Sequence, residues 1–290
     1  MIKHGRPVFV STGCVRGVEP LPARLCLLRE FGLRNIELGS GVSAEPAEIA
    51  ALTQDGCSYL VHNYFPPPRD PFVLNLASGN TNVRRRSVSH VLAALKLALR
   101  LKAPFYSVHA GFVTDPCGFD GTSFVFPAPD SPMETAAAME RFGTALSEIL
   151  QHAERLGLQL LVENNVFTPG LRDNLLLAAA EDFLGLLRRL SSPNLGMLLD
   201  LGHLGVTART FGFSATSYAS AVAPYVRAMH VHDNDGTADT HQPIQAGSWV
   251  LDVLRRPEFV GLPVIVEARF GSVFDLRQHV GWLKTEMGRE

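Results

Sequence analysis

Short apolar segments alternate with longer segments of helical periodicity along the whole chain. The apolar segments are bounded by glycine, proline and polar turn residues, which is typical of strands in a parallel sheet that is covered on both faces. The expected strands are Pro7–Thr12, Arg34–Leu38, Ser58–Asn63, Phe105–His109, Gln159–Asn164, Gly196–Asp200, Val226–His232 and Pro263–Glu267. The segments between them have the pattern of amphipathic helices, so the chain is expected to consist of repeated strand–helix units.

Two of the expected helices are long. The periodicity predicts one helix over Arg84–Leu101 and another over Ser131–Leu156. Ser131 and Glu134 have the spacing of a capping box at the start of the second helix.

Eight strand–helix units close a barrel more naturally than they fill an open sheet. The pattern therefore predicts the α/β class and a (β/α)8 TIM barrel that forms one domain over residues 1–290. No linker-like stretch separates two complete patterns. An open doubly wound sheet is the alternative, but no GxGxxG motif follows the first strand, so no nucleotide cofactor is expected.

Composition and charge narrow the range of partners. With 46% hydrophobic and 19% charged residues, the chain can bury a large core. A net charge of −2 disfavours nucleic acid, and the run Arg84–Arg86 is interpreted as a solvated helix start. The four cysteines are widely spread, as in reduced thiols. No apolar stretch approaches the roughly 20 residues of a membrane span, so a cytoplasmic protein is expected, compatible with a homo-oligomer.

Three strand-to-helix connections are long, namely Tyr64–Asn82, Ala110–Asp130 and Asn165–Asp173. In a barrel all three lie at the catalytic end. The second contains the phenylalanines Phe112, Phe119, Phe124 and Phe126. Two interpretations stay open for these rings: an apolar lid over a site, or a loop packed on its own aromatic residues.

Six consecutive apolar segments end in, or are followed closely by, ionisable residues. These are His62, His109, Glu163, Asp200, His203, His230, His232, Asp239, His241 and Glu267. Taken singly, such a residue is usually a satisfied core residue or a helix cap. Because parallel strands end on one face of a barrel, the groups should converge, and clustered carboxylates would repel by several kcal/mol without a cation. The pattern therefore predicts a divalent-metal site.

Mixed imidazole and carboxylate ligands favour zinc, manganese, iron or cobalt over calcium. His230 and His232 have the same parity in their strand, so both are expected to point into the barrel. Their spacing alone does not decide which of the two binds the metal.

Several motifs resemble those of the xylose-isomerase-like TIM barrels, the superfamily that also contains the endonuclease IV-type apurinic endonucleases. They are Val162-Glu163-Asn164, Asp200-Leu-Gly-His203, the run from His230 to His241, Val264-Ile-Val-Glu267, and the tract from Leu74 into the arginine-rich helix. The resemblance covers nearly the whole chain. One departure follows His241, where the family commonly reads Pro-Leu-Gly-x-Gly and this chain reads Gln242-Pro-Ile-Gln-Ala-Gly-Ser248.

The resemblance implies a set of functional residues. The metal site of the sugar isomerases and epimerases corresponds to Glu163, Asp200, His230 and Glu267. The positions that hold further zinc ions in the endonucleases, or contact substrate in sugar-acting relatives, correspond to His62, His109, His203, Asp239 and His241.

Two functions follow from these assignments. The expected partner is a small-molecule sugar or polyol. In a sugar or sugar phosphate isomerase or epimerase, the metal binds two neighbouring oxygens of a hydroxy-ketone and stabilises an enediolate, with Glu163 and Glu267 as base and acid. Arg269 would polarise a substrate oxygen or form a structural ion pair. The alternative is a zinc-dependent phosphodiesterase acting on abasic DNA, which would use all of the candidate ligands. The lack of basic charge and the long apolar loops favour sugar chemistry.

Two further classes of protein fit the sequence less well. A catalytically silent barrel should lack some ligands, and none is missing. A structural zinc site would favour cysteines, and none lies among the candidate ligands.

Overall fold

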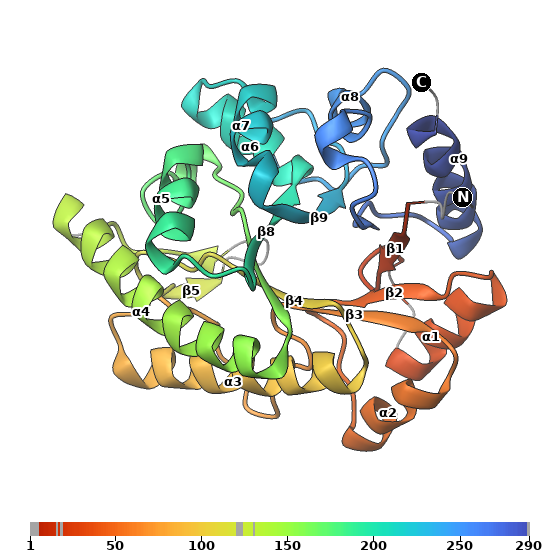
Figure 1. The fold of residues 1–290 in the computed structure, drawn as a ribbon, viewed down its shortest axis with the longest axis horizontal. Coiled ribbons are helices and arrows are strands. Elements are labelled where there is room, and N and C mark those ends of the chain that lie inside the picture. Colours follow the sequence, from red (N-terminus) through yellow and green to blue (C-terminus); the bar gives the residue numbers. More distant parts are fainter. Residues whose placement is uncertain (1–5, 16, 18–19, 120–123, 130, 289–290) are drawn as a thin grey trace.

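Eight parallel strands form a closed barrel surrounded by helices (Figure 1). The computed structural model describes residues 6–15, 17, 20–119, 124–129 and 131–288. The barrel strands are β1 (Val8–Ser11), β2 (Asn35–Leu38), β3 (Ser58–His62), β4 (Phe105–His109), β7 (Gln159–Glu163), β8 (Leu195–Asp200), β9 (Val226–Val231) and β10 (Val264–Val266). Their order around the barrel is β1-β10-β9-β8-β7-β4-β3-β2, so the predicted fold and each predicted strand are confirmed.

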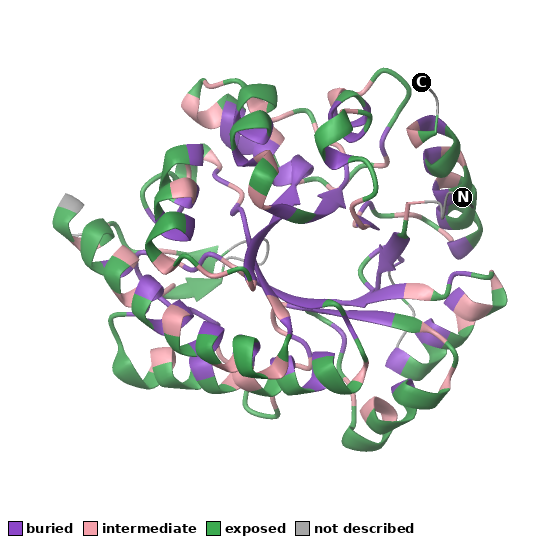
Figure 2. Cartoon of the chain, viewed as in Figure 1, coloured by how far each residue is buried: buried purple, intermediate pink, exposed green. Residues whose placement is uncertain are grey.

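The helices lie on the outside of the barrel and cover its strands. They are α1 (Leu21–Glu30), α2 (Pro46–Ala51), α3 (Thr81–Arg100), α4 (Pro132–Leu156), α5 (Ala180–Leu190), α6 (Leu201–Phe211), α7 (Ala215–Val222), α8 (Trp249–Leu254) and α9 (Val273–Met287). Figure 2 shows that most helices are buried on the side toward the barrel and exposed on the outer side, and that the barrel strands are buried almost throughout. The buried positions are mostly apolar, as expected of amphipathic helices.

The starts of the two long helices differ in detail from the predictions. Helix α3 begins at Thr81, before the predicted Arg84, because the Asn80 side chain accepts hydrogen bonds from the backbone N–H groups of Asn82 and Val83. Helix α4 begins directly after Ser131 as predicted, but the Ser131 side chain makes no capping hydrogen bond. The prediction that the Ser131 side chain takes part in a capping box is therefore wrong.

The long connections gather at the carboxyl end of the barrel. The one after β4 contains a short antiparallel hairpin, β5 (Gly118–Phe119) and β6 (Phe124–Val125), where the sequence predicted only a loop; residues 120–123 and 130 of that loop lie outside the described residues. The connection after β7 extends to α5 at Ala180, past the predicted end at Asp173. In the described part of the chain, no helix has the length and hydropathy needed to cross a membrane.

An apolar layer fills the inside of the barrel below the carboxyl ends of the strands. It consists of Phe9, Leu60, Phe105, Leu161, Leu198, Ala228 and Ile265. Because strand side chains alternate, the residue two positions further along each strand also points inward. Those residues are Ser11, His62, Ser107, Glu163, Asp200, His230 and Glu267. The apolar layer is thus the floor on which a polar layer lies.

Candidate metal centre

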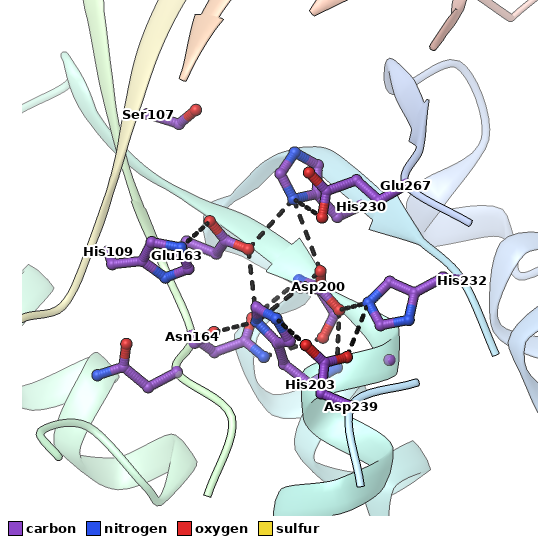
Figure 3. A network of polar contacts seen from close by, with 12 residues as sticks. Ser107, His109, Glu163, Asn164, Asp200, His203, His230, His232, Asp239 and Glu267 are labelled. Carbon is purple, nitrogen blue, oxygen red and sulfur yellow. Dashed lines mark hydrogen bonds and ion pairs between the residues drawn. The ribbon is translucent and has the colours of Figure 1, made fainter. Parts of the chain in front are cut away.

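The imidazole of His230 lies at the centre of the polar layer (Figure 3). Its Nδ1 is 3.1 Å from Oε1 of Glu163, 3.4 Å from Oε2 of Glu267 and 3.6 Å from Oδ2 of Asp200. Among the described residues, the buried oxygens Oε2 of Glu163 and Oδ2 of Asp200 have no hydrogen-bond partner. Three buried or half-buried carboxylates around one ring nitrogen match the ligand set that a divalent cation of the zinc or manganese type takes.

The opposite nitrogen of His230 contacts a residue that the sequence reasoning missed. Oε2 of Glu37, in β2, lies 3.0 Å from Nε2 of His230, and both side chains are fully buried. A carboxylate on the far nitrogen fixes the ring orientation and makes Nδ1 a stronger ligand. The available signal was a charged residue between the apolar residues Ile36 and Leu38.

The ionisation of these groups is set by burial and by the neighbouring charges. Burial raises the pKa of Glu163, but the imidazoles around it, His109 and His230 foremost, leave that pKa below its ordinary value. Burial lowers the pKa of His230, and the carboxylates, first that of Glu267, raise it well above its ordinary value. Burial lowers the pKa of His109 to about 4, so this ring is neutral near pH 7 and able to bind a metal.

A second group of ligand-type residues lies on the β3 and β4 side. Nε2 of His62 is 3.3 Å from Oε2 of Glu163, and Nε2 of His109 is 3.6 Å from the same oxygen. Nδ1 of His62 is held at 2.9 Å by the hydroxyl of Ser107. His62, His109 and Glu163 therefore form a compact group that shares Glu163 with the His230 centre.

A third group lies on the β8 to β10 side, around Asp239. Its Oδ2 is 3.6 Å from Nε2 of His203 and 3.0 Å from Nε2 of His241. Nδ1 of His203 faces the backbone carbonyl of Asn164, and Nδ1 of His241 faces that of Glu267. Because a carbonyl only accepts hydrogen bonds, each Nδ1 carries a proton, which leaves Nε2 of each ring as the nitrogen that faces the Asp239 carboxylate.

His232 lies in this third group and not beside Glu163. Its Nε2 is 3.2 Å from Oδ1 of Asp200 and 3.7 Å from Oδ1 of Asp239. Its ring stacks on that of His241 at a centroid distance of 4.2 Å. The ring occupies the space above Gly202, where a Cβ atom would come within 1.9 Å of Cε1 of His232. His230 is therefore the histidine surrounded by the three predicted carboxylate ligands, and its role as a ligand stays a prediction.

A cavity of about 510 Å³ opens above the three groups. The satellite residues His62, His109, His203, Asp239 and His241 line it, together with Glu267 and Arg269. Every residue that the sequence reasoning selected for the site thus lies in one connected cluster at the carboxyl end of the barrel.

Similarity to known proteins agrees with the fold. The family model described as "Xylose isomerase-like TIM barrel" matches residues 25–286, and the chain belongs to this family, as the motifs predicted.

Two curated relatives match this chain at 26% identity over the aligned residues. An uncharacterised protein of Methanocaldococcus jannaschii is 26% identical over 203 residues, which is 70% of this chain and 62% of that protein. The fructoselysine 3-epimerase of Escherichia coli O157:H7 is 26% identical over 195 residues, which is 66% of this chain and 61% of the epimerase. The matches thus span less than two thirds of either relative's length.

Solved structures share the fold over nearly the whole chain. A D-tagatose 3-epimerase-like protein superposes with a TM-score of 0.74 at 21% identity, covering 97% of each chain. The TTHB071 protein of Thermus thermophilus, soaked with zinc chloride, superposes with a TM-score of 0.63 at 21% identity, covering 98% of this chain and 99% of that one.

Proposed function

We propose that the chain is a metal-dependent sugar isomerase or epimerase. The observation that carries this proposal is the convergence of Glu163, Asp200 and Glu267 on Nδ1 of His230, at the floor of a cavity sized for a small molecule. The similarity to a fructoselysine 3-epimerase supports it.

Glu163, Asp200, His230 and Glu267 would hold the cation. When bound there, a divalent cation would supply Lewis-acid stabilisation of the negative charge that develops on neighbouring substrate oxygens. Burial raises the pKa of Asp200, but the imidazoles around it outweigh burial and leave that pKa well below its ordinary value. The chain therefore presents this carboxylate in its ionised, ligating form.

Two carboxylates are placed to move a proton. Glu163 is on β7 and Glu267 follows β10, and β8 and β9 separate these two strands in the barrel. The two side chains thus approach the centre from different directions, as removal and return of a proton on opposite faces of a carbon requires. Glu267 lines the cavity, whereas Glu163 lies beneath it and is 1% exposed.

Solvent exchange tests the proposal. The protein supplied with Mn²⁺ in D₂O should incorporate deuterium at the carbon beside the carbonyl of at least one ketose in a broad panel, and EDTA should stop this exchange. Glu163→Gln and Glu267→Gln should each slow it by about 10²-fold or more, because proton transfer by a positioned carboxylate contributes that much. Glu148→Gln, on the exposed face of α4, is the matched control. Absence of exchange across the whole panel would contradict the proposal.

The satellite groups favour a second candidate, a zinc-dependent phosphodiesterase. The groups of His62, His109 and Glu163, and of His232, Asp239 and His241, could each hold a further cation. Two or more tightly bound zinc ions per chain, together with cleavage of an abasic-site oligonucleotide, would place this candidate first. The net charge of −2 argues against it, because duplex DNA is bound mainly through contacts of lysine and arginine to phosphates.

A further inference from the structure

The cavity above the metal centre has two chemically different walls. One wall is mainly apolar and is formed by the loops after β4 and β7. It contains Phe112, Phe124, Phe126, Val166, Leu171 and Leu175, with Asn165 as a polar member whose amide group is bonded to the carbonyls of Gly111 and Leu176. The other wall includes Ser11 at the end of β1, Ser40 after β2, and Glu267 and Arg269 after β10. In the strand order, β7 lies opposite β1 and β4 lies opposite β10. The apolar and polar walls therefore face each other across the centre.

The phenylalanine rings of the apolar wall are not fully buried against one another. The ring of Phe112 lies 5.1 Å from that of Phe126 and 6.4 Å from that of Phe124. Phe124 is still 41% exposed, and Phe119, 5.8 Å from it on the other strand of the hairpin, is 62% exposed. A loop packed only on itself would bury these rings. Because Phe124 lines the cavity, its exposure leaves apolar area that a ligand can cover.

An unsubstituted ketose is chemically complementary to the polar wall of this cavity but not to the apolar wall. Such a sugar carries an oxygen on every carbon, and hydroxyls placed against the phenylalanine wall would lose water without gaining a hydrogen-bond partner. A ligand with one hydroxylated end and one apolar end would satisfy both walls. The cavity of about 510 Å³ is in the size range of pockets for such ligands.

Building on the proposed function, we infer that the substrate is a hydroxy-ketone that carries an apolar aryl or alkyl substituent. The substituent lies against Phe112, Phe124 and Phe126, and the hydroxylated part lies between the metal centre and the polar wall.

Binding of matched probes tests this inference. The probes are D-fructose, its 1-deoxy-1-(4-methylphenylamino) derivative and its 6-O-benzyl ether, which place an aryl group at either end of the sugar. In calorimetric titrations of the Mn²⁺-supplied protein, at least one aryl derivative should bind tenfold or more tightly than D-fructose. Phe124→Ser should bring the ratio of the two affinities toward one, because it removes part of the wall. Phe274→Ser, at a 56% exposed phenylalanine of α9, should leave the ratio unchanged.

The outcomes separate this inference from the proposed function. Equal affinity for D-fructose and both aryl derivatives, or an aryl preference that Phe124→Ser leaves intact, overturns the inference. Deuterium exchange on D-fructose without any aryl preference keeps the proposed function and rejects the inference. An aryl preference without exchange at any carbon keeps the inference about the ligand and rejects the proposed chemistry. Binding of none of the probes rejects both.

Discussion

At the scale of single residues, several imidazoles of the site are held by one ring nitrogen while the other faces a carboxylate. His62 is held by Ser107, His203 and His241 by backbone carbonyls, and His230 by Glu37. This arrangement fixes the direction of each remaining ring nitrogen before any cation arrives. His232 differs, because no hydrogen bond from a described residue holds its Nδ1, while its Nε2 faces the carboxylates of Asp200 and Asp239.

Glu37→Gln tests whether the Glu37 carboxylate orients the ring of His230. The variant removes the negative charge 3.0 Å from Nε2 of His230 but keeps the size of the side chain. We expect the affinity for Mn²⁺ or Zn²⁺ to fall by about 10- to 100-fold, as for other groups that support a metal-binding histidine. Competition titration against a chelator measures it, with Glu148→Gln as the control. An unchanged affinity would mean that Glu37 has no part in orienting His230.

Gly202→Ala tests the placement of His232. The added Cβ would lie 1.9 Å from the ring of His232, so the ring or the start of α6 must move. We expect the free energy of unfolding to fall by about 1–3 kcal/mol, as is usual for overpacking. Urea denaturation measures it.

Two companion variants show whether contact with His232 is the cause. Gly185→Ala, in α5 where the new Cβ meets nothing within 4 Å, should stabilise the protein by about 0.5–1 kcal/mol. His232→Ala in the Gly202→Ala background should recover part of the loss. A double variant as unstable as the two single losses added together would show that the clash is elsewhere.

At the scale of elements, the junction between β8 and α6 supplies both structure and chemistry. Oδ1 of Asp200 accepts a hydrogen bond of 2.7 Å from the backbone N–H of His203 and so caps α6. Oδ2 of the same carboxylate faces Nδ1 of His230. The cap places His203 in the first turn of the helix, where its Nε2 reaches Asp239. One aspartate therefore joins the helix start to the metal centre.

Substitutions of Asp200 should separate these two roles. Asp200→Asn keeps an oxygen for the cap and removes the charge, so we expect metal affinity to be lost while the metal-free protein keeps its helix cap. Asp200→Ala removes the cap as well and should cost about 1 kcal/mol more in stability of the metal-free protein. Thermal unfolding in EDTA and metal titration measure the two effects. Equal stability of both variants in EDTA would show that the cap contributes nothing.

At the scale of the whole molecule, barrel closure gathers carboxylates from separate strands into one buried layer. Glu37, Glu163 and Asp200 are each at most 1% exposed. In the described part of the chain, imidazoles lie beside these carboxylates and offset their charge, and a bound cation would add to this and should stabilise the entire barrel.

Addition and removal of metal test whether a cation bound at the site stabilises the fold. Adding Zn²⁺ or Mn²⁺ at about 100 times its dissociation constant should raise the free energy of unfolding by roughly 2.7 kcal/mol, and EDTA should reverse the gain. Differential scanning calorimetry follows the corresponding rise in Tm. The Glu163→Gln variant should show a much smaller rise. A rise of the same size in this variant would mean that the ion stabilises the protein from another position.

Much of the fold and of the site could be predicted from the sequence. Both depend on the period of the hydrophobic positions and on the common direction of the parallel strands. Alternation along each strand determines which side chains point inward, and parallel strands end on one face, so His62, Glu163, Asp200 and Glu267 had to meet. The start of α3 was missed because the Asn80 cap lies before the amphipathic pattern begins. The hairpin after β4 was missed because its strands are too short to show any period.

Only the tertiary structure determined which side chains face each other across the barrel. His230 and His232 share one parity, and only the closed barrel places Glu163 beside the first and Asp239 beside the second. Glu37 comes within reach of His230 although 193 residues separate them, because β2 and β9 belong to the same ring of strands. Local sequence determines the direction of a side chain, whereas its partners depend on strand order and closure, which are properties of the whole chain.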